Sequence, residues 1–191
     1  MLDLSAFRKA SPNTRRRRYT VTLTCSSSVE SMDAVLEPTA VRWLLGHFAT
    51  GVTVLTCRSS SGADIGVTVS AFASVSLQPA LVLVCVERRT EVCRFLGTAT
   101  EFAINVLASD QEEIARRFAQ RCEQRFAGVA VTRGKTGAPL LHGALAHLEC
   151  RTSSMQNAGD HSIFVGEIIS GSAQLGNPLL HFRGSFTRLN P

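Results

Sequence analysis

The sequence predicts a mainly β fold, a β-barrel with added helices in one domain. About six or seven strand-like segments follow one another with turn residues between most of them, and two or three helical patterns are inserted. The length of 191 residues suits a single core, and 45% hydrophobic against 18% charged residues is typical of a globular protein. No internal repeat or interdomain linker interrupts this pattern.

The first 38 residues are predicted to form a disordered basic leader. Most of the net charge of +5 lies there, chiefly in Arg15-Arg16-Arg17-Arg18, and such a run is typical of a solvated tail. Residues 19–25 alternate apolar and hydroxyl side chains, so the sequence does not indicate an export signal. Met32 is a candidate start of translation, and the folded domain is predicted over residues 39–191.

A helix is predicted over residues 39–48, where apolar side chains recur at helical spacing. These side chains are Val41, Leu44, Leu45 and Phe48. We expect Trp43 and Phe48 to pack into the core. A β-hairpin should follow, with strands over residues 52–57 and 65–70 joined by a Ser-rich turn.

Small hydroxyl residues and turn signals lie within residues 66–84, between two strand-like runs. Such a segment is typical of a solvated loop, and its low bulk would also let backbone N–H groups approach a phosphate or a flat ring. The apolar run over residues 80–87 predicts a strand buried on both faces. A short helix over residues 88–100 and a strand over residues 101–107 should follow, with Asn105 satisfying backbone groups.

The second half of the chain predicts one helix and three strands. The helix is expected over residues 110–119, because its first four residues resemble a capping box. Two long strands are expected over residues 144–153 and 162–170, and a last strand over residues 179–189.

Several common catalytic and binding motifs are absent from the sequence. No G-x-G-x-x-G follows a strand, and no G-x-S-x-G nucleophile elbow occurs. Gly128 and Gly134 precede Lys135-Thr136 as in a P-loop, but five residues separate the two glycines where four are required. The five histidines lack metal-ligand spacing, so we expect no metal site.

The six cysteines are scattered along the chain without any C-x-x-C spacing. Most of them lie in apolar patterns, where a free cysteine acts as a small hydrophobe. No apolar run reaches the roughly 18 residues that a membrane span needs. We therefore expect a cytoplasmic protein with reduced thiols, no membrane segment and no nucleic-acid partner.

Eight short segments occur in one order over residues 39–189. They are Gly51-Val52-Thr53-Val54-Leu55-Thr56, the Ser-rich segment, Phe102-Ala103-Ile104-Asn105-Val106-Leu107, Ala115-Arg116-Arg117-Phe118, Arg125-Phe126-Ala127-Gly128, Ala138-Pro139-Leu140-Leu141, Gly159-Asp160-His161 and Phe182-Arg183-Gly184. In this order and at these distances they resemble the flavin reductase family of the FMN-binding split barrel. Its members are the reductase components of two-component flavin-dependent monooxygenases.

The resemblance implies a six-stranded FMN-binding split β-barrel that forms a homodimer, with flavin near the subunit interface. It implies reduction of FMN or FAD by NADH or NADPH, followed by release of reduced flavin to a partner monooxygenase component. Hydride transfer needs no protein nucleophile, because the protein has only to stack the two rings and tune their electronics.

The resemblance also implies which residues form the site. The flavin ring would lie along Asp64, Ile65, Gly66, Val67, Thr68, Val69, Ser70 and Ala71. The ribityl chain and phosphate would lie near Cys85, Val86, Glu87, Thr90, Glu91 and Val92. Arg117 and Phe118 would also touch flavin, and His161 would face the nicotinamide.

Some of these residues have other interpretations or depart from the family. From the sequence alone, His161 is a polar residue after Gly-Asp in a hairpin turn. Relatives commonly carry Ser where this chain has Ala71. Glu87 and Glu91 would repel a phosphate unless Arg88 or Arg89 turns inward.

Two other functions are alternatives. A non-catalytic flavin-binding module on the same barrel would need no nicotinamide site, and Gly159-Asp160-His161 is the feature that separates it from a reductase. An oxidase of the pyridoxamine-phosphate type would need a basic cluster for a second phosphate. The arginines that residues 144–189 could contribute to such a cluster are Arg151, Arg183 and Arg188.

Overall fold

The computed structural model describes residues 21–25, 28–32, 37–97, 99–120, 122 and 124–189. The chain divides into two units, residues 1–45 and 46–191. Most of the predicted leader, residues 1–38, lies outside the described residues. Within that range β1 (Val21–Cys25) pairs antiparallel with β2 (Ser28–Met32).

Helix α1 (Pro38–Leu45) confirms the predicted helix but not its predicted burial. None of its residues is buried, and Trp43 is 54% exposed. Phe48 follows the helix and is 77% exposed. The expectation that Trp43 and Phe48 belong to the core is therefore wrong for this chain, because helical spacing identifies an apolar face but not what covers it.

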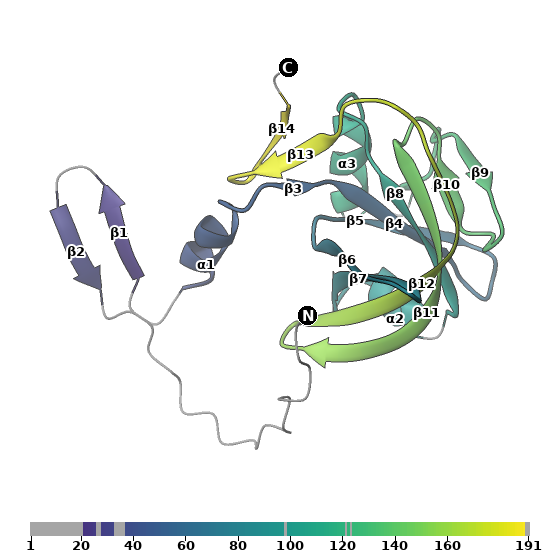
Figure 1. Cartoon of the computed structure of the whole chain (residues 1–191), viewed down its shortest axis with the longest axis horizontal. Helices are drawn as coiled ribbons and strands as arrows, with labels where there is room; N and C mark the ends of the chain where they lie inside the picture. Colours follow the sequence, from purple (N-terminus) through teal and green to yellow (C-terminus); the bar gives the residue numbers. More distant parts are fainter. Residues whose placement is uncertain are drawn as a thin grey trace. The chain divides into compact units, whose positions relative to one another are not determined.

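Residues 46–191 are built on one antiparallel sheet of seven strands (Figure 1). Its strands, in spatial order, are β5 (Asp64–Val69), β4 (Thr53–Arg58), β8 (Glu101–Val106), β11 (Ala146–Ala158), β12 (His161–Ala173), β7 (Ala80–Glu87) and β6 (Phe72–Leu77). Two short helices accompany it, α2 (Glu91–Leu96) and α3 (Glu112–Ala119). The prediction of a mainly β fold with added helices is confirmed.

Smaller strands complete this unit. A three-stranded sheet contains β3 (Thr50–Gly51), β13 (Leu179–Phe182) and β14 (Ser185–Arg188). Strands β9 (Val131–Arg133) and β10 (Pro139–Leu141) form a separate pair. The last strand, expected over residues 179–189, is in fact a hairpin, because Arg183 and Gly184 adopt positive φ angles of 49° and 78° and reverse the chain.

Three other expectations differ from the structure. The Ser-rich segment contains strand β6, which pairs with β7 and supplies one edge of the sheet. Strand β7 has the predicted bounds, but burial alternates along it, so its outer face is only half-buried. Helix α3 begins after Gln111, whose side chain makes no cap hydrogen bond to the helix, so the predicted capping box does not form.

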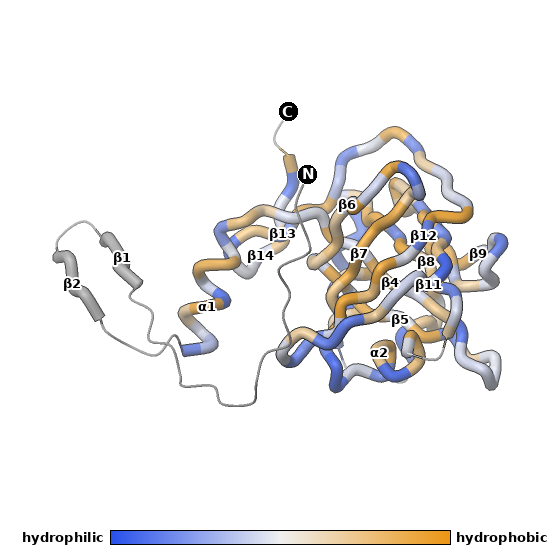
Figure 2. Tube along the Cα trace, turned by 60° about the horizontal axis from the view of Figure 1, so that its bottom comes forward, coloured by the Kyte–Doolittle hydropathy of each residue, from blue (hydrophilic) through white to orange (hydrophobic). Residues whose placement is uncertain are grey.

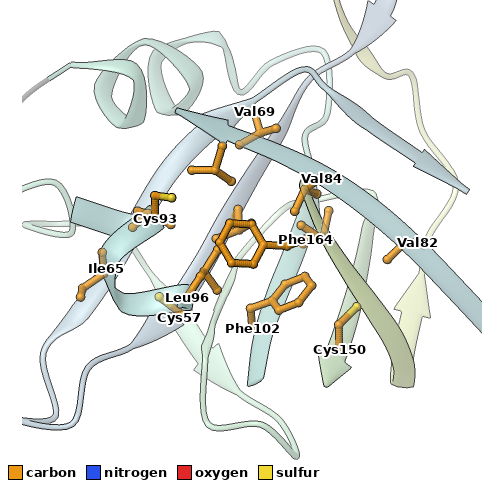
Figure 3. Close-up of a cluster of buried hydrophobic side chains, with 14 residues drawn as sticks. Cys57, Ile65, Val69, Val82, Val84, Cys93, Leu96, Phe102, Cys150 and Phe164 are labelled. Carbon is orange, nitrogen blue, oxygen red and sulfur yellow. The ribbon is translucent and has the colours of Figure 1, made fainter. Parts of the chain in front are cut away.

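The core consists of two clusters of buried apolar side chains. One cluster includes the fully buried Phe102 and Phe164, whose rings are shown in Figure 3. The other packs Ala115 and Phe118 of α3 against Val54 of β4. Fully burying side chains of this size contributes about 1.5–3 kcal/mol each.

Buried polar side chains tie the small strands to the main sheet. Asn105 donates to the carbonyl of Val54 at 3.0 Å and accepts from the backbone N–H of Leu141 at 2.8 Å. The Thr56 hydroxyl donates to the carbonyl of Pro139 at 2.6 Å. The prediction that Asn105 satisfies backbone groups is confirmed, and the contact fixes β10 beside β4 and β8.

Among the described residues, no helix has the length and apolar character needed to cross a membrane.

Candidate functional site

A cavity of about 550 Å³ lies where β5, β7, β12, α2 and the end of α3 approach one another. This volume falls in the range of pockets that hold small ligands, roughly 300–1,000 Å³. Eleven residues of the predicted site line it: Val67, Thr68, Val69, Ser70, Ala71, Cys85, Val86, Glu87, Thr90, Glu91 and His161. The fold thus brings together segments that are far apart in the sequence.

The end of β5 and the residues after it form one wall of the cavity. The Thr68 hydroxyl donates to the carbonyl of Ala115 at 2.7 Å and so ties this strand to α3. The carbonyl of Ala71 accepts from the backbone N–H of Cys85 at 3.0 Å. The wall is therefore held by backbone and side-chain bonds, and its small side chains leave room for a flat ligand.

A second wall is formed by the end of β7 and the turn into α2. Thr90 caps α2, because its hydroxyl accepts from the Cys93 backbone N–H at 3.2 Å and donates to the Glu87 carbonyl at 2.7 Å. Burial raises the pKa of the Cys85 thiol, which keeps this cysteine neutral. Cys85 therefore contributes a small, uncharged surface to the cavity.

Two exposed arginines place positive charges beside the negative charges of this wall. Arg89 and Arg94 line the cavity together with Glu87 and Glu91. Within the described part of the chain, neither arginine forms an ion pair. Arg89 therefore lines the cavity, whereas Arg88 is not among its lining residues.

His161 is the first residue of β12 and follows the two-residue turn Gly159-Asp160. Gly159 has a φ of 62°, the left-handed conformation that favours glycine. The His161 Nδ1 lies 2.7 Å from Asp160 Oδ1, and this hydrogen bond lowers the pKa of the Asp160 carboxyl. Because an ionised carboxylate only accepts, the bond places a proton on Nδ1 and leaves Nε2 free of that proton.

Six residues of the predicted site do not line the cavity. Ile65, Val92 and Phe118 belong to the core, and Asp64 pairs with Arg133 at 2.7 Å. Gly66 lies against the Phe118 ring, and a Cβ at Gly66 would come within 2.7 Å of it.

Arg117, the sixth of these residues, lines a neighbouring hollow instead. Its guanidinium donates to the carbonyl of Ala127 at 2.8 Å and pairs with Glu113 at 3.2 Å. Arg116 pairs with Glu112 at 2.6 Å on the exposed side of the same helix. These arginines are therefore paired with carboxylates one helical turn away.

The structure adds residues that the site prediction did not include. Arg94, Ala119, Cys122 and Arg125 line the cavity beside Arg89. Arg125 belongs to one of the eight segments that carry the family resemblance, but the resemblance assigned it no role in the site. Arg94 lies one turn into α2, and only the fold shows that this side of α2 faces the cavity.

Comparison with known proteins now identifies the family. A family model described as "Flavin reductase like domain" matches residues 45–190. The chain belongs to the flavin reductase family. The match covers the whole seven-stranded sheet and both walls of the cavity.

Individual flavin reductases are similar over most of the chain. The reductase subunit HsaB of a flavin-dependent monooxygenase from Rhodococcus jostii (strain RHA1) is 36% identical over 82% of this chain and 80% of its own. The FMN reductase (NADH) SmoA of Agrobacterium fabrum is 40% identical over 76% of this chain and 83% of its own.

A solved flavin reductase also shares the fold. The Streptomyces globisporus NADH:FAD oxidoreductase SgcE6, in complex with NAD and FAD fragments, has a TM-score of 0.77 and 39% identity. The match covers 80% of this chain and 93% of that one. The predicted fold class is therefore confirmed, although the main sheet has seven strands where the family resemblance implied six.

The cavity fits a flavin mononucleotide in two respects and leaves room for a second ring. Its β5 wall carries small side chains, which suits a flat ring. Arg89 and Arg94 supply cations for a phosphate. His161, with its ring nitrogen Nε2, stands in the same cavity where a second ring could stack.

Proposed function

We propose that the chain reduces FMN or FAD with NADH in this cavity and supplies reduced flavin to a partner monooxygenase component. One observation carries the proposal: the small-residue wall of β5 and His161 of β12 line the same cavity. The relatives named as an FMN reductase (NADH) and an NADH:FAD oxidoreductase support the donor. The relative named as a monooxygenase reductase subunit supports the partner.

The chain's own residues would position two rings and hold a phosphate. Val67–Ala71 would support the flavin ring, and Arg89 with Arg94 would bind its phosphate. His161 would hydrogen-bond the carboxamide of the nicotinamide through Nε2, the ring nitrogen that Asp160 does not engage. Bound flavin supplies the hydride acceptor, and the protein supplies proximity and orientation.

Flavin-dependent loss of NADH absorbance tests this function. We expect the purified chain to consume NADH only when FMN or FAD is added. NADPH in place of NADH, tested with each flavin, would show the preferred donor. Binding of flavin without consumption of either nicotinamide would instead support the non-catalytic flavin-binding module.

His161→Ala is expected to raise KM for NADH about 2- to 10-fold, the equivalent of one lost hydrogen bond of roughly 0.5–1.5 kcal/mol. The dissociation constant of FMN should change little, because His161 would face the nicotinamide. Steady-state kinetics and flavin titration measure the two quantities. His142→Ala is the control, since His142 lines a different hollow. A weaker FMN affinity with an unchanged KM for NADH would contradict the assigned role.

We also propose that two copies of the chain associate through the outer face of β7 and β12. Half-buried apolar side chains line this face, and Figure 2 shows hydrophobic residues along β7. They are Leu81, Leu83, Ile163 and Val165. Ile163 pairs with Cys85, which lines the cavity, so the apolar face reaches the site.

Light scattering should give a mass twice the chain's 20.6 kDa. Leu83→Lys should shift the mass to that of one chain, because a charge on an apolar interface has no partner there. Leu175→Lys is the matched control, since Leu175 is already fully exposed. A single-chain mass for the unchanged protein at micromolar concentration would refute the homodimer.

The proposed location is the cytoplasm. Cys57, Cys93 and Cys150 are buried, unpaired thiols, and burial raises the pKa of Cys57 and Cys150 to about 12. Neutral buried thiols of this kind act as small hydrophobic residues and suit a reducing compartment.

A further inference from the structure

Arg125 is a cation held in place on the wall of the cavity. We propose that Arg125 meets the flavin ring rather than the phosphate, at the edge that becomes negatively charged, and so binds reduced flavin more tightly than oxidised flavin. The proposal rests on the proposed function and adds to it a residue that favours the product of the reaction.

Two backbone carbonyls fix the guanidinium of Arg125. Its Nε donates to the carbonyl of Gln120 at 2.8 Å, and its Nη1 donates to the carbonyl of Gly66 at 3.0 Å. A guanidinium has five N–H groups, so about three remain for a ligand. The side chain is half-buried and lines the cavity. The cation is therefore positioned before any ligand arrives.

The neighbouring residue anchors this arrangement in the core. The ring of Phe126 packs edge-on against the buried Phe118 at 4.9 Å between ring centroids. Phe118 in turn lies against Gly66, the residue whose carbonyl Arg125 binds. Strand β5, α3 and Arg125 thus form one packed unit beside the wall that would support the flavin ring.

No carboxylate neutralises this charge in the part of the chain that the structure describes, because the ion pairs found there involve other residues. Among the described residues this half-buried cation therefore has no counter-ion, and an anionic ligand would supply one. The apolar dimethylbenzene edge of a flavin would offer the Arg125 guanidinium neither a hydrogen-bond acceptor nor a negative charge. The N1 and C2 carbonyl edge of the ring offers acceptors and is the matching partner.

Arg125 differs from Arg89 and Arg94 in exposure and in hydrogen bonding. Arg89 and Arg94 are exposed, and no hydrogen bond is found for either side chain among the described residues. Exposed cations suffice for a phosphate, whose charge is present in both redox states. A fixed cation is most useful where charge develops during the reaction, because it needs no reorganisation at that moment.

Hydride transfer creates such a charge on the ring. The C4–H bond of NADH breaks with its electron pair, an N5–H bond forms on the flavin, and NAD⁺ leaves. The two electrons reduce the ring, which then carries one negative charge shared between N1 and the C2 carbonyl. A cation at that edge therefore stabilises the product more than the oxidised ring.

Arg125→Gln tests the proposal, because glutamine removes the charge and keeps an amide that can donate to a carbonyl. Affinities for FMN and for riboflavin are measured in the oxidised state, and in the reduced state without oxygen. For both FMN and riboflavin, we expect the ratio of the affinity for the reduced form to the affinity for the oxidised form to be at least about 10-fold lower in Arg125→Gln than in the unchanged protein. For a two-electron couple this corresponds to a potential of the bound flavin about 30 mV more negative.

Arg94→Gln is the matched control at the phosphate side. It should weaken FMN equally in both redox states and leave riboflavin, which has no phosphate, unchanged. Arg125→Lys keeps the charge and should preserve the preference for the reduced form even if the glutamine variant is poorly folded.

Three results would overturn the inference. The first is an Arg125→Gln variant that loses affinity for FMN but not for riboflavin, since Arg125 would then bind the phosphate. The second is an equal loss for oxidised and reduced riboflavin, and the third is an Arg125→Lys variant without preference for the reduced form. Failure of the unchanged protein to bind any flavin would instead refute the proposed function.

Discussion

Replacing Gly166 by alanine is expected to lower the free energy of unfolding by about 1–3 kcal/mol, the range for overpacking a tightly packed core. A Cβ at this position would lie 2.5 Å from Cζ of Phe102 and 3.0 Å from Cβ of Cys150. Phe102 is fully buried in the same cluster as Phe164, so its ring can move only by displacing other core side chains. Urea or thermal unfolding measures the change.

Gly51→Ala is the matched control for this substitution. Gly51 also lies in a strand, but a Cβ there would meet no atom within 4 Å. We expect its effect to stay within about 0.5 kcal/mol, as for most surface changes. If Gly166→Ala unfolds at the same urea concentration as Gly51→Ala, the packing of β12 against Phe102 is not as described.

Replacing Glu149 by glutamine is expected to lower the free energy of unfolding by about 2–4 kcal/mol, the range for breaking buried hydrogen bonds to a charged group. The Glu149 carboxylate is only 4% exposed and accepts bonds from the Thr136 backbone N–H at 2.7 Å and the Thr136 hydroxyl at 2.9 Å. The Lys135 backbone N–H and the Ser170 hydroxyl also bond to it. An amide NH₂ in the same place would face donors instead of acceptors.

Glu149 also makes stability depend on pH. Burial raises the pKa of this carboxyl, but the bonds from Thr136, Lys135 and Ser170 outweigh burial, and the pKa in the folded state lies below its ordinary value. The unfolded chain therefore binds the proton more readily. The stability that Glu149 contributes is complete above the ordinary glutamate pKa and is lost as the pH falls through the lowered one.

We therefore expect the difference in stability between the unchanged protein and Glu149→Gln to be largest near neutral pH and to narrow in acid. Glu112→Gln is the control, because Glu112 pairs with Arg116 on an exposed helix face and should matter little. A difference that stays constant from neutral to acid pH would show that the Glu149 carboxylate is not held by these donors.

Local sequence patterns predicted those strands that are marked by a short apolar run between turn residues. The β-branched and apolar runs located β4, β5, β7 and β8 within about two residues, because each is bounded by turn residues. The Gly134-Lys135-Thr136 segment was excluded as a P-loop by its spacing. The structure gives the segment another task, since its N–H groups and hydroxyl bind the internal carboxylate of Glu149.

Other features depend on contacts that no local pattern carries. Strand β6 is rich in Ser and was expected as a loop, but pairing with β7 satisfies its backbone. The hairpin at the C-terminus depends on positive φ at Arg183 and Gly184. Phe118 was assigned to the flavin by its place in a motif, whereas the motif has a packing role there, because Phe118 fills the space beside Gly66.

In the candidate site, too, the residues of one strand could be predicted from the sequence, whereas residues from separate segments could not. Residues adjacent in the sequence, such as Val67–Ala71, were predicted together because one strand carries them. Arg94 and Arg125 reach the cavity from separate segments, and only the fold shows that both line it. The family resemblance supplied the role of His161, and the structure added its hydrogen bond to Asp160.

Mixing the protein with equal amounts of FMN and NADH in the absence of oxygen is the most direct test of the central claim. Absorbance then follows NADH and oxidised FMN in the same sample. The proposed function predicts that both disappear together, one for one, at a rate proportional to the protein. Binding of FMN with no loss of NADH would contradict it and would leave a flavin-binding module without reductase activity.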